Sequence, residues 1–361
     1  MISFIHSGDI HLGTAFKTAT FGNSKGEERR GELWNSFQRL IDYAIDKKSD
    51  LIILAGDLFE EDMFTIKDIN KLKDIIGEAK DQRIVITAGN HDKLNLKSMY
   101  NRIVWPENTT ILKDKKINKV EFDDIKVTLY GYSWANEIED LKEQLFKIEK
   151  NPNHYNILVM HADIFENSAY LPLDLKQLKV LDMDYIALGH IHKPEFLSHN
   201  IAYCGSLEPL DFGEIGKRGF IEGKLGETHS FEFRPFSKRE FYIKEFILSE
   251  DMTLNEIITK IKELTEGAYN KNFYRVILKG VMPFYIDLED IESALREEFY
   301  HIELIAKYRR DFDIEKIKKE NENNIISKYI DSFNEEDLKD ETIRDAFYMG
   351  LYSLLEGGET L

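Results

Sequence analysis

The chain has 361 residues, a formal net charge of −18 and a single cysteine. Its length exceeds that of one typical domain, so we expect two domains. The acidity argues against a protein whose whole surface binds nucleic acid, although a local basic groove or a metal site can still meet phosphate. One cysteine excludes an intrachain disulfide framework and is typical of a reducing compartment.

The N-terminal segment lacks the basic and apolar parts of a signal peptide. No stretch of the sequence reaches the roughly 18 consecutive apolar residues that a membrane helix needs. We therefore expect a cytoplasmic protein without membrane segments.

The first 160 residues alternate between strand and helix patterns. Apolar residues from Leu33 to Ile45 recur at helical spacing, and a second helical stripe runs from Ile66 to Ile76. Short apolar runs at 51–55 and 83–88 stand on either side of that second stripe. This βαβαβ order predicts parallel strands that are covered by helices.

Strand patterns dominate the next part of the chain, from 109 to 135 and again from 184 to 235. A helix is expected between them, from about 136 to 149. Two packed sheets with flanking helices accommodate this order, so the sequence predicts an α/β domain over residues 1–239.

Three smaller segments are expected after that domain. Residues 240–310 read as a small βαβαβ unit, and the polar residues 311–335 as a linker or a solvated helix. A helix within 336–361 is too short to be stable alone in water, so its apolar face must pack on its own domain or on a partner. That face consists of Ile343, Phe347, Leu351 and Leu354.

Polar residues follow five of the apolar runs, and these residues are candidate metal ligands. A lone Gly-Asn-His-Asp is often only a turn, and a lone histidine after a strand can be a satisfied core residue. Five such endings in order instead predict one site built from the ends of neighbouring strands. The residues are Asp9, His11, Asp57, Asn90, His161, His190 and His192.

The types of donor indicate which metals could bind. A carboxylate such as Asp57 can bridge two cations, which would give two sites of four protein ligands each. Nitrogen and oxygen donors without thiolate suit manganese, iron or zinc better than magnesium or calcium. Two such ions can clamp a phosphoryl group and activate water. His91 lies between Asn90 and Asp92 and should point away from the metals, so it is a candidate general acid.

These motifs resemble those of the calcineurin-like metallophosphoesterases. The five matching blocks are Asp9-x-His11, Gly56-Asp57, Gly89-Asn90-His91-Asp92, His161 and Gly189-His190-x-His192. Three longer segments are similar to SbcD-type DNA-repair exonucleases, especially their YhaO-like branch. These are Asp9 to Gly13, Gly189 to Pro194 and Tyr203 to Pro209.

The resemblance implies a four-layer αββα sandwich with a small α+β capping domain at 240–310 and a C-terminal helix. It also implies two Mn²⁺ ions, with iron, zinc or magnesium as substitutes. One ion would be held by Asp9, His11, Asp57 and His192, and the other by Asp57, Asn90, His161 and His190. His91 matches the family's catalytic histidine, with Asp92 orienting it.

The implied function is a manganese-dependent DNA exonuclease, with endonuclease activity as a variant. The implied partner is a coiled-coil ATPase of the SbcC or YhaN type, docked on the C-terminal helix. A homodimer is also compatible with the resemblance. A nucleotide phosphodiesterase or phosphatase on the same metal site is the alternative. A non-catalytic assembly factor is disfavoured because no ligand is missing. Candidate DNA contacts are Arg29, Arg30, Lys217 and Arg218, with Lys238 and Arg239.

Overall fold

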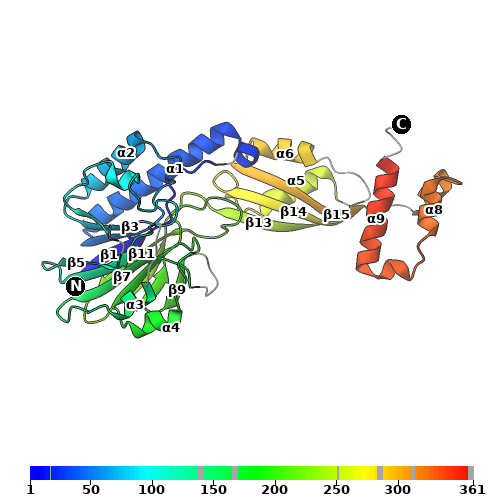
Figure 1. Ribbon diagram of the computed structural model, residues 1–361. Coiled ribbons are helices and arrows are strands. Elements are labelled where there is room, and N and C mark those ends of the chain that lie inside the picture. The colour runs from blue at the N-terminus through cyan, green and yellow to red at the C-terminus, as the bar shows by residue number, and fades with distance from the viewer. Residues whose placement is uncertain are drawn as a thin grey trace. The chain divides into compact units, whose positions relative to one another are not determined.

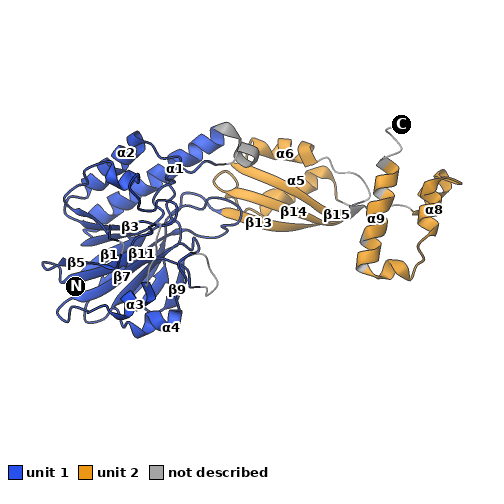
Figure 2. Ribbon diagram, in the orientation of Figure 1, with its two compact units in different colours: residues 1–240 blue, residues 241–361 orange. Residues whose placement is uncertain are grey.

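The computed structural model describes residues 1–16, 18–114, 116–135, 141–164, 170–249, 252–282, 288–310 and 314–356. Figure 1 shows the helices and strands of these ranges, and Figure 2 shows that they form two compact units, residues 1–240 and 241–361. The start of the helix expected from 136 lies outside the described residues. Among the helices within these ranges, none is long and apolar enough to cross a membrane.

The described residues of the first unit form two six-stranded mixed sheets. The first sheet has, in spatial order, β12 (Ser230–Pro235), β11 (Gly219–Leu225), β1 (Ile2–Ser7), β2 (Leu51–Ala55), β3 (Arg83–Thr87) and β4 (Thr109–Ile111). The second has β5 (Asn118–Phe122), β6 (Val127–Tyr132), β7 (Tyr155–His161), β8 (Tyr185–Gly189), β10 (Ile201–Tyr203) and β9 (Glu195–Ser198).

The two sheets pack face to face around a shared apolar core. Phe4 and Ile53 of the first sheet and Leu129 and Val159 of the second belong to one cluster of fully buried side chains. Successive residues of a strand point to opposite faces, so a strand covered on both faces needs apolar residues throughout. All five residues of β2 are buried, which explains the unbroken apolar run at 51–55.

Helices cover the outer face of each sheet (Figure 1). α1 (Thr18–Asp46) and α2 (Ile66–Glu78) lie on the side of the first sheet, and Thr65 and Asp68 form a capping box that starts α2. α3 (Leu141–Phe146) and α4 (Leu175–Val180) pack on the second sheet through a separate core cluster. A short 3₁₀ helix, η1 (Met99–Asn101), follows β3. The predicted αββα layering is therefore confirmed.

The second unit begins with a small parallel sheet, whose described strands are β13 (Phe241–Leu248), β14 (Phe273–Met282) and β15 (His301–Arg310). α5 (Leu254–Glu263) and α6 (Leu288–Arg296) connect these strands, and both pack on the same face of the sheet. Thr253 and Glu256 form the capping box of α5. Residues 283–287 lie outside the described part of the chain.

Helices occupy most of the segment 311–335, for which the sequence left a linker or a solvated helix open. α7 (Ile314–Glu320) and α8 (Ile325–Asp331) precede η2 (Asp337–Lys339) and the C-terminal α9 (Glu341–Glu356). The side-chain oxygen of Asn324 accepts hydrogen bonds from the N–H groups of Ile326 and Ser327 and so caps α8. The polar run that suggested a linker therefore contains the cap of a helix, the other alternative that the sequence left open.

α9 packs against α8, so part of the apolar face that was expected to dock a partner is buried within the chain itself. Phe347 and Leu351 are almost fully buried and form a cluster with Ile326 and Ile330 of α8. Leu354 is partly buried against the same cluster, whereas Ile343 is 39% exposed. Phe347 and Leu351 are thus committed to the chain's own core, the alternative that the sequence left open.

Replacing Phe347 should loosen this helical group selectively. Phe347→Ala removes a ring that stacks on Tyr329, and deletion of a buried phenylalanine typically costs about 3–5 kcal/mol. Hydrogen exchange measured by mass spectrometry should show lost protection in α8 and α9 and unchanged protection in β1 to β3. Met349→Ala, at a position 71% exposed, is the matched control. Equal protection in both variants would contradict this packing.

Candidate metal centre

The predicted ligands lie at one edge of the two sheets because of strand direction. β1, β2 and β3 are parallel neighbours, and Asp9, Asp57 and Asn90 follow their carboxyl ends. β7 and β8 are parallel neighbours in the second sheet, with His161 ending one and His190 following the other. Carboxyl ends of parallel strands meet at the same edge, so residues distant in sequence converge there.

The backbone at this edge adopts an uncommon conformation. Asp9, His11, Asp57 and His190 have φ angles of 48°, 51°, 50° and 100°. Non-glycine residues rarely take positive φ, and each instance costs on the order of 1–3 kcal/mol unless its surroundings hold it. Four of the seven predicted ligands therefore occupy strained positions, a pattern that concentrates at functional sites.

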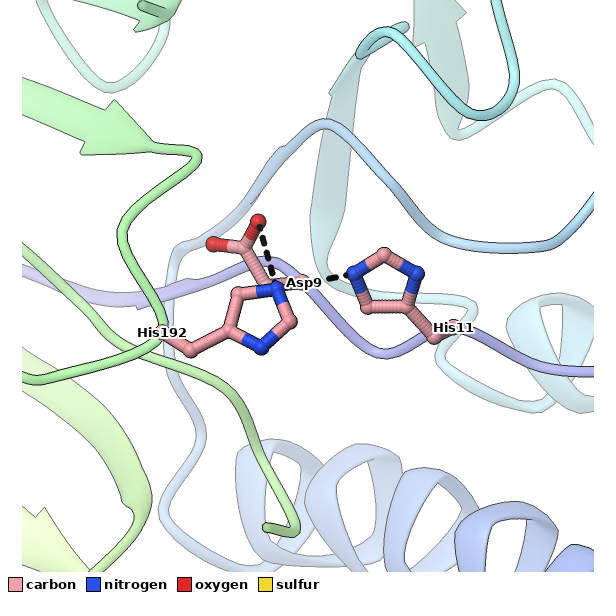
Figure 3. Close-up of side chains that lie close together, drawn as sticks. All are labelled: Asp9, His11 and His192. Carbon is pink, nitrogen blue, oxygen red and sulfur yellow. Dashed lines mark hydrogen bonds and ion pairs between the residues drawn. The ribbon is translucent and has the colours of Figure 1, made fainter. Parts of the chain in front are cut away.

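Asp9, His11 and His192 form the first group of donors (Figure 3). The Nε2 atoms of His11 and His192 are 3.0 Å apart, and His192 Nε2 lies 4.0 Å from an oxygen of Asp9. One ligand atom from each of the three residues lies within 4.8 Å of the others. This spacing suits three donors that share one cation.

Asp57 connects the first group to a second one. Its Oδ2 lies 3.2 Å from His161 Nε2 and 3.8 Å from His11 Nε2, and the side-chain oxygen of Asn90 lies 3.0 Å from His161 Nε2. The carboxylate thus faces histidines from both sheets. This is the placement expected of a ligand that bridges two cations.

In three histidines, His11, His161 and His192, the Nδ1 atom has a partner within the protein, which leaves the Nε2 atom available as a ligand. His161 Nδ1 lies 3.0 Å from the carbonyl oxygen of Ala55, which can only accept, so this nitrogen carries the proton. His11 Nδ1 lies 2.7 Å from Glu60 and His192 Nδ1 lies 2.6 Å from Glu214. Partners of this kind fix the tautomer of metal-binding histidines. Three Nε2 lone pairs and two carboxylates therefore converge, and this donor set fits divalent cations.

The charges at the site favour a cation. Burial by itself lowers the pKa of His161, but the Asp57 carboxylate more than offsets this and raises it to about 9. Burial also lowers the pKa of His192, yet the hydrogen bond to Glu214 and the charge of Asp9 raise it to about 9. Both histidines thus lie in a strongly negative field, which would stabilise bound metal as it stabilises a proton.

His190 lies beside these groups, and its side chain is near both His161 and Asp163. Its backbone N–H donates to the carboxylate of Asp9 at 3.1 Å. Its ring contacts that of His161 edge-on at 5.2 Å, and its Nε2 lies 4.0 Å from Asp163. Burial lowers the pKa of His190, which favours the neutral ring with its lone pair. Gly189 precedes it because a Cβ there would overlap the carbonyl oxygen of Ala55.

His91 is oriented by Glu60, which corrects the expectation that Asp92 orients it. The Nδ1 of His91 lies 2.8 Å from Glu60 Oε2, and the side chain is 44% exposed. The hydrogen bond to Glu60 raises the pKa of His91. Burial alone would raise the pKa of Glu60, but the hydrogen bonds from His11 and His91 lower it to about 2, so it is ionised at neutral pH.

Asp92 instead holds the backbone of the site. Its buried carboxylate accepts hydrogen bonds from the N–H groups of Gly89 and Leu58 and from the hydroxyl of Tyr100, at 2.6, 2.8 and 2.7 Å. Burial and the nearby charge of Asp57 raise the pKa of Asp92 to about 6. Asp92 therefore supports the loops after β2 and β3 and does not touch the ring of His91.

Sequence reasoning missed two carboxylates that contact the predicted histidines. Glu60 comes three residues after Asp57, and its acidic character next to a predicted ligand was an available signal. Glu214 accepts from His192 and from the hydroxyl of Ser206, but it is 22 residues away from His192 in sequence. Nothing in the local pattern around Glu214 indicates this contact.

Three of the predicted DNA contacts are buried in ion pairs, which corrects their assignment. Arg29 is fully buried, pairs with Glu32 and donates to the carbonyl oxygen of Pro209. Arg218 is 3% exposed beside Glu214, and Arg239 is 7% exposed against Glu32. Their charges are neutralised inside the unit. Lys238 is exposed but paired with Glu32, Lys217 is exposed and Arg30 is half-buried.

Comparison with known proteins identifies the family. The sequence profile of the calcineurin-like phosphoesterases matches residues 2–194, which is more than half of the 361 residues. The chain belongs to this family. Calcineurin-like phosphoesterases are hydrolases of phosphoester bonds that use a dimetal centre, so the protein is a hydrolase of that class. The resemblance inferred from the sequence motifs is confirmed.

Three relatives show how similar this calcineurin-like phosphoesterase is to other proteins. YhaO of Bacillus subtilis, an uncharacterized metallophosphoesterase, is 26% identical over 82% of this chain and 78% of its own. The DNA double-strand break repair protein Mre11 of Methanocaldococcus jannaschii is 24% identical, over 72% and 73%. Mre11 of Methanococcus maripaludis is also 24% identical, over 99% and 96%.

Asp57→Asn should weaken metal binding in both groups. The neutral amide replaces the anionic carboxylate whose Oδ2 faces both His11 and His161, so both groups lose their shared ligand. Manganese bound per chain after gel filtration should fall well below two equivalents. Asp42→Asn, an exposed carboxylate of α1, should change nothing. Two retained equivalents in Asp57→Asn would rule out the bridging role.

Proposed function

We propose that this protein is a manganese-dependent DNA nuclease that hydrolyses phosphodiester bonds as an exonuclease, with endonuclease activity as a variant. One observation carries the proposal. The donors of Asp57, His11, His161 and His192 converge at the strand ends, next to an exposed histidine, His91, that is held by a carboxylate. Such a site can bind a phosphate diester and supply a proton within one small region.

The proposed metal assignment follows from the donors. One ion would be held by Asp9, His11, Asp57 and His192, and the other by Asp57, Asn90, His161 and His190. Imidazole nitrogen together with carboxylate and amide oxygen suits manganese, and iron, zinc or magnesium are the substitutes to test. Two divalent cations held by these residues would supply polarisation of the phosphoryl group and a lowered pKa of an attacking water.

The chain's own residues supply orientation and a proton. Asp57 Oδ1 accepts a hydrogen bond from the backbone N–H of His91 at 2.8 Å. The contact that positions the bridging ligand therefore also positions His91. Glu60 occupies Nδ1 of His91, which leaves Nε2 as the nitrogen that can face substrate. A proton on that Nε2 can pass to the oxygen that leaves when the phosphodiester bond breaks.

Two kinds of support point to DNA as the substrate. Two of the relatives are named DNA double-strand break repair proteins, and this chain spans 73% and 96% of their lengths. The Tyr203–Pro209 segment resembles SbcD-type nucleases, and the similarity to the Mre11 protein of Methanococcus maripaludis covers 99% of this chain, so it extends beyond the ligand motifs. Arg30 and Lys217 remain the candidate contacts to the DNA backbone.

A nucleotide phosphodiesterase or phosphatase is the second candidate function. It is favoured by the net charge of −18 and by the burial of Arg29 and Arg218, because both features reduce the attraction of the isolated chain for a polyanion. A small substrate needs fewer phosphate contacts than duplex DNA does. The same metal groups would serve both chemistries.

The proposed partner is a coiled-coil ATPase of the SbcC or YhaN type, docked on the three helices α7, α8 and α9. Apolar side chains that stay exposed on these helices, such as Ile325, Ile343 and Met349, are available to it. Deletion of residues 314–361 should abolish co-purification with such an ATPase and preserve hydrolysis of a small phosphodiester. If the truncated chain still co-purifies fully with the ATPase, these helices are not the docking site.

His91→Ala should separate metal binding from turnover. The variant should keep its manganese, because the ring is held by Glu60, and lose roughly 10²- to 10⁴-fold in rate, the usual contribution of a positioned acid. Rates are measured with manganese on single-strand DNA, double-strand DNA, a small phosphodiester and a phosphomonoester. His199→Ala, an exposed histidine elsewhere in the unit, is the control.

The same panel decides between the two candidate functions. A DNA nuclease should hydrolyse one of the DNA substrates faster than the small phosphodiester. Faster hydrolysis of the small diester or of the monoester would favour the second function. Loss of manganese in His91→Ala, or survival of its activity, would contradict the role of His91.

A further inference from the structure

The two carboxylate oxygens of Glu60 contact two histidines that have different proposed roles, His11 as a metal ligand and His91 as the acid. Oε1 lies 2.7 Å from Nδ1 of His11, a proposed metal ligand, and Oε2 lies 2.8 Å from Nδ1 of His91. The two rings meet edge to face, with centroids 4.9 Å apart and planes at 82°. One carboxylate therefore spans the boundary between the metal site and the proposed acid.

The backbone fixes Glu60 between the loops that carry these histidines. Its N–H donates to the carbonyl oxygen of Leu12, next to His11, at 2.9 Å. The following N–H, of Glu61, donates to the carbonyl oxygen of His91 at 3.2 Å. Phe59, the preceding residue, is buried in a stack with Phe64, which anchors the same segment. Glu60 is thus held in place independently of its side-chain contacts.

We propose that Glu60 is a positioning residue that fixes the orientation and tautomer of His11 and His91 together. This inference rests on the proposed function, since it gives that site a residue that couples metal binding to proton transfer. Each oxygen accepts one Nδ1–H, so the Nε2 of His11 is free for metal and the Nε2 of His91 is directed outward. Only a residue with two acceptor oxygens can serve both rings.

Glu214 provides a matched comparison within the same site. It holds Nδ1 of His192 at 2.6 Å as Glu60 holds that of His11, but its other oxygen lies near Ser206 Oγ and the N–H of Leu210. Replacement of either glutamate by glutamine should weaken metal binding, because outer partners of ligating histidines typically contribute about 10- to 100-fold. Only the change at Glu60 should also disturb His91.

The first measurement separates metal affinity from turnover. Isothermal titration with Mn²⁺ gives the affinity of Glu60→Gln and Glu214→Gln, and hydrolysis of a small phosphodiester gives kcat and KM at saturating manganese. We expect Glu214→Gln to recover the wild-type kcat, and Glu60→Gln to remain about 10- to 100-fold lower with little change in KM. Glu303→Gln, which alters a glutamate–histidine pair in the second unit, should match the wild type throughout.

The second measurement reads the ring of His91 without any substrate. Nitrogen-15 labelling of the ten histidines allows ring spectra of the zinc-loaded protein, because zinc is diamagnetic. Nδ1 of His91 should carry a proton in the wild type and in Glu214→Gln, and this proton should shift or exchange in Glu60→Gln. If thermal melting shows that Glu60→Gln is unfolded, Glu60→Asp, whose carboxylate is one carbon too short to reach both rings, replaces it.

An unchanged His91 spectrum in the Glu60 variant, or full recovery of its kcat by manganese, would overturn the proposal. These outcomes differ from failure of the proposed function. If the wild type hydrolyses no phosphodiester, the nuclease assignment fails, whereas the ring spectra and the manganese affinities still decide whether Glu60 positions both histidines.

Discussion

Asp57 joins the loops on which the whole candidate site depends. Its backbone carbonyl accepts hydrogen bonds from the N–H groups of Ile10 and His11 at 2.9 and 3.0 Å, and its Oδ1 accepts from His91. Its Oδ2 faces His161, which comes from the second sheet. The residue does this with a φ of 50°, so three loops and two sheets constrain one strained position.

Two buried carboxylates at this corner have different tasks because their partners differ. Asp57 faces imidazole nitrogens, whereas Asp92 accepts from backbone N–H groups and from the hydroxyl of Tyr100. A buried carboxylate is tolerated only where donors replace water, and N–H groups at loop ends supply those donors. Asp92 thus stabilises the loop geometry within which Asp57 and His91 take their positions.

The C-terminal helices show how few apolar residues can specify a core. Its buried members are Ile326 and Ile330 of α8 and Phe347 and Leu351 of α9, and partly buried residues such as Tyr329, Phe333 and Leu354 pack against them. Asn324 begins α8 by capping it. Since these side chains face each other, any partner surface on this group must be built from the residues that remain exposed.

The sequence by itself determined the strand-rich regions, the βαβαβ order of the first 160 residues and which side chains are candidate donors. Buried strands need apolar residues on both faces and metal chemistry needs particular side chains, and both requirements are visible within short windows such as Leu51–Asp57. The family followed from the same windows. The convergence of the donors was an inference from parallel strand ends, and the described structure groups Asp9, His11, Asp57, His161 and His192 in that way.

Only the tertiary structure decided which groups face each other. Glu214 reaches His192 across 22 residues and Arg29 reaches Pro209 across 180, and no local pattern records such contacts. For the same reason sequence reasoning gave Asp92 a task that belongs to Glu60, because neighbours in the chain need not be neighbours at a loop. Hydrogen-bond partners depend on distances set by the packing of both sheets, and that packing is a property of the whole unit.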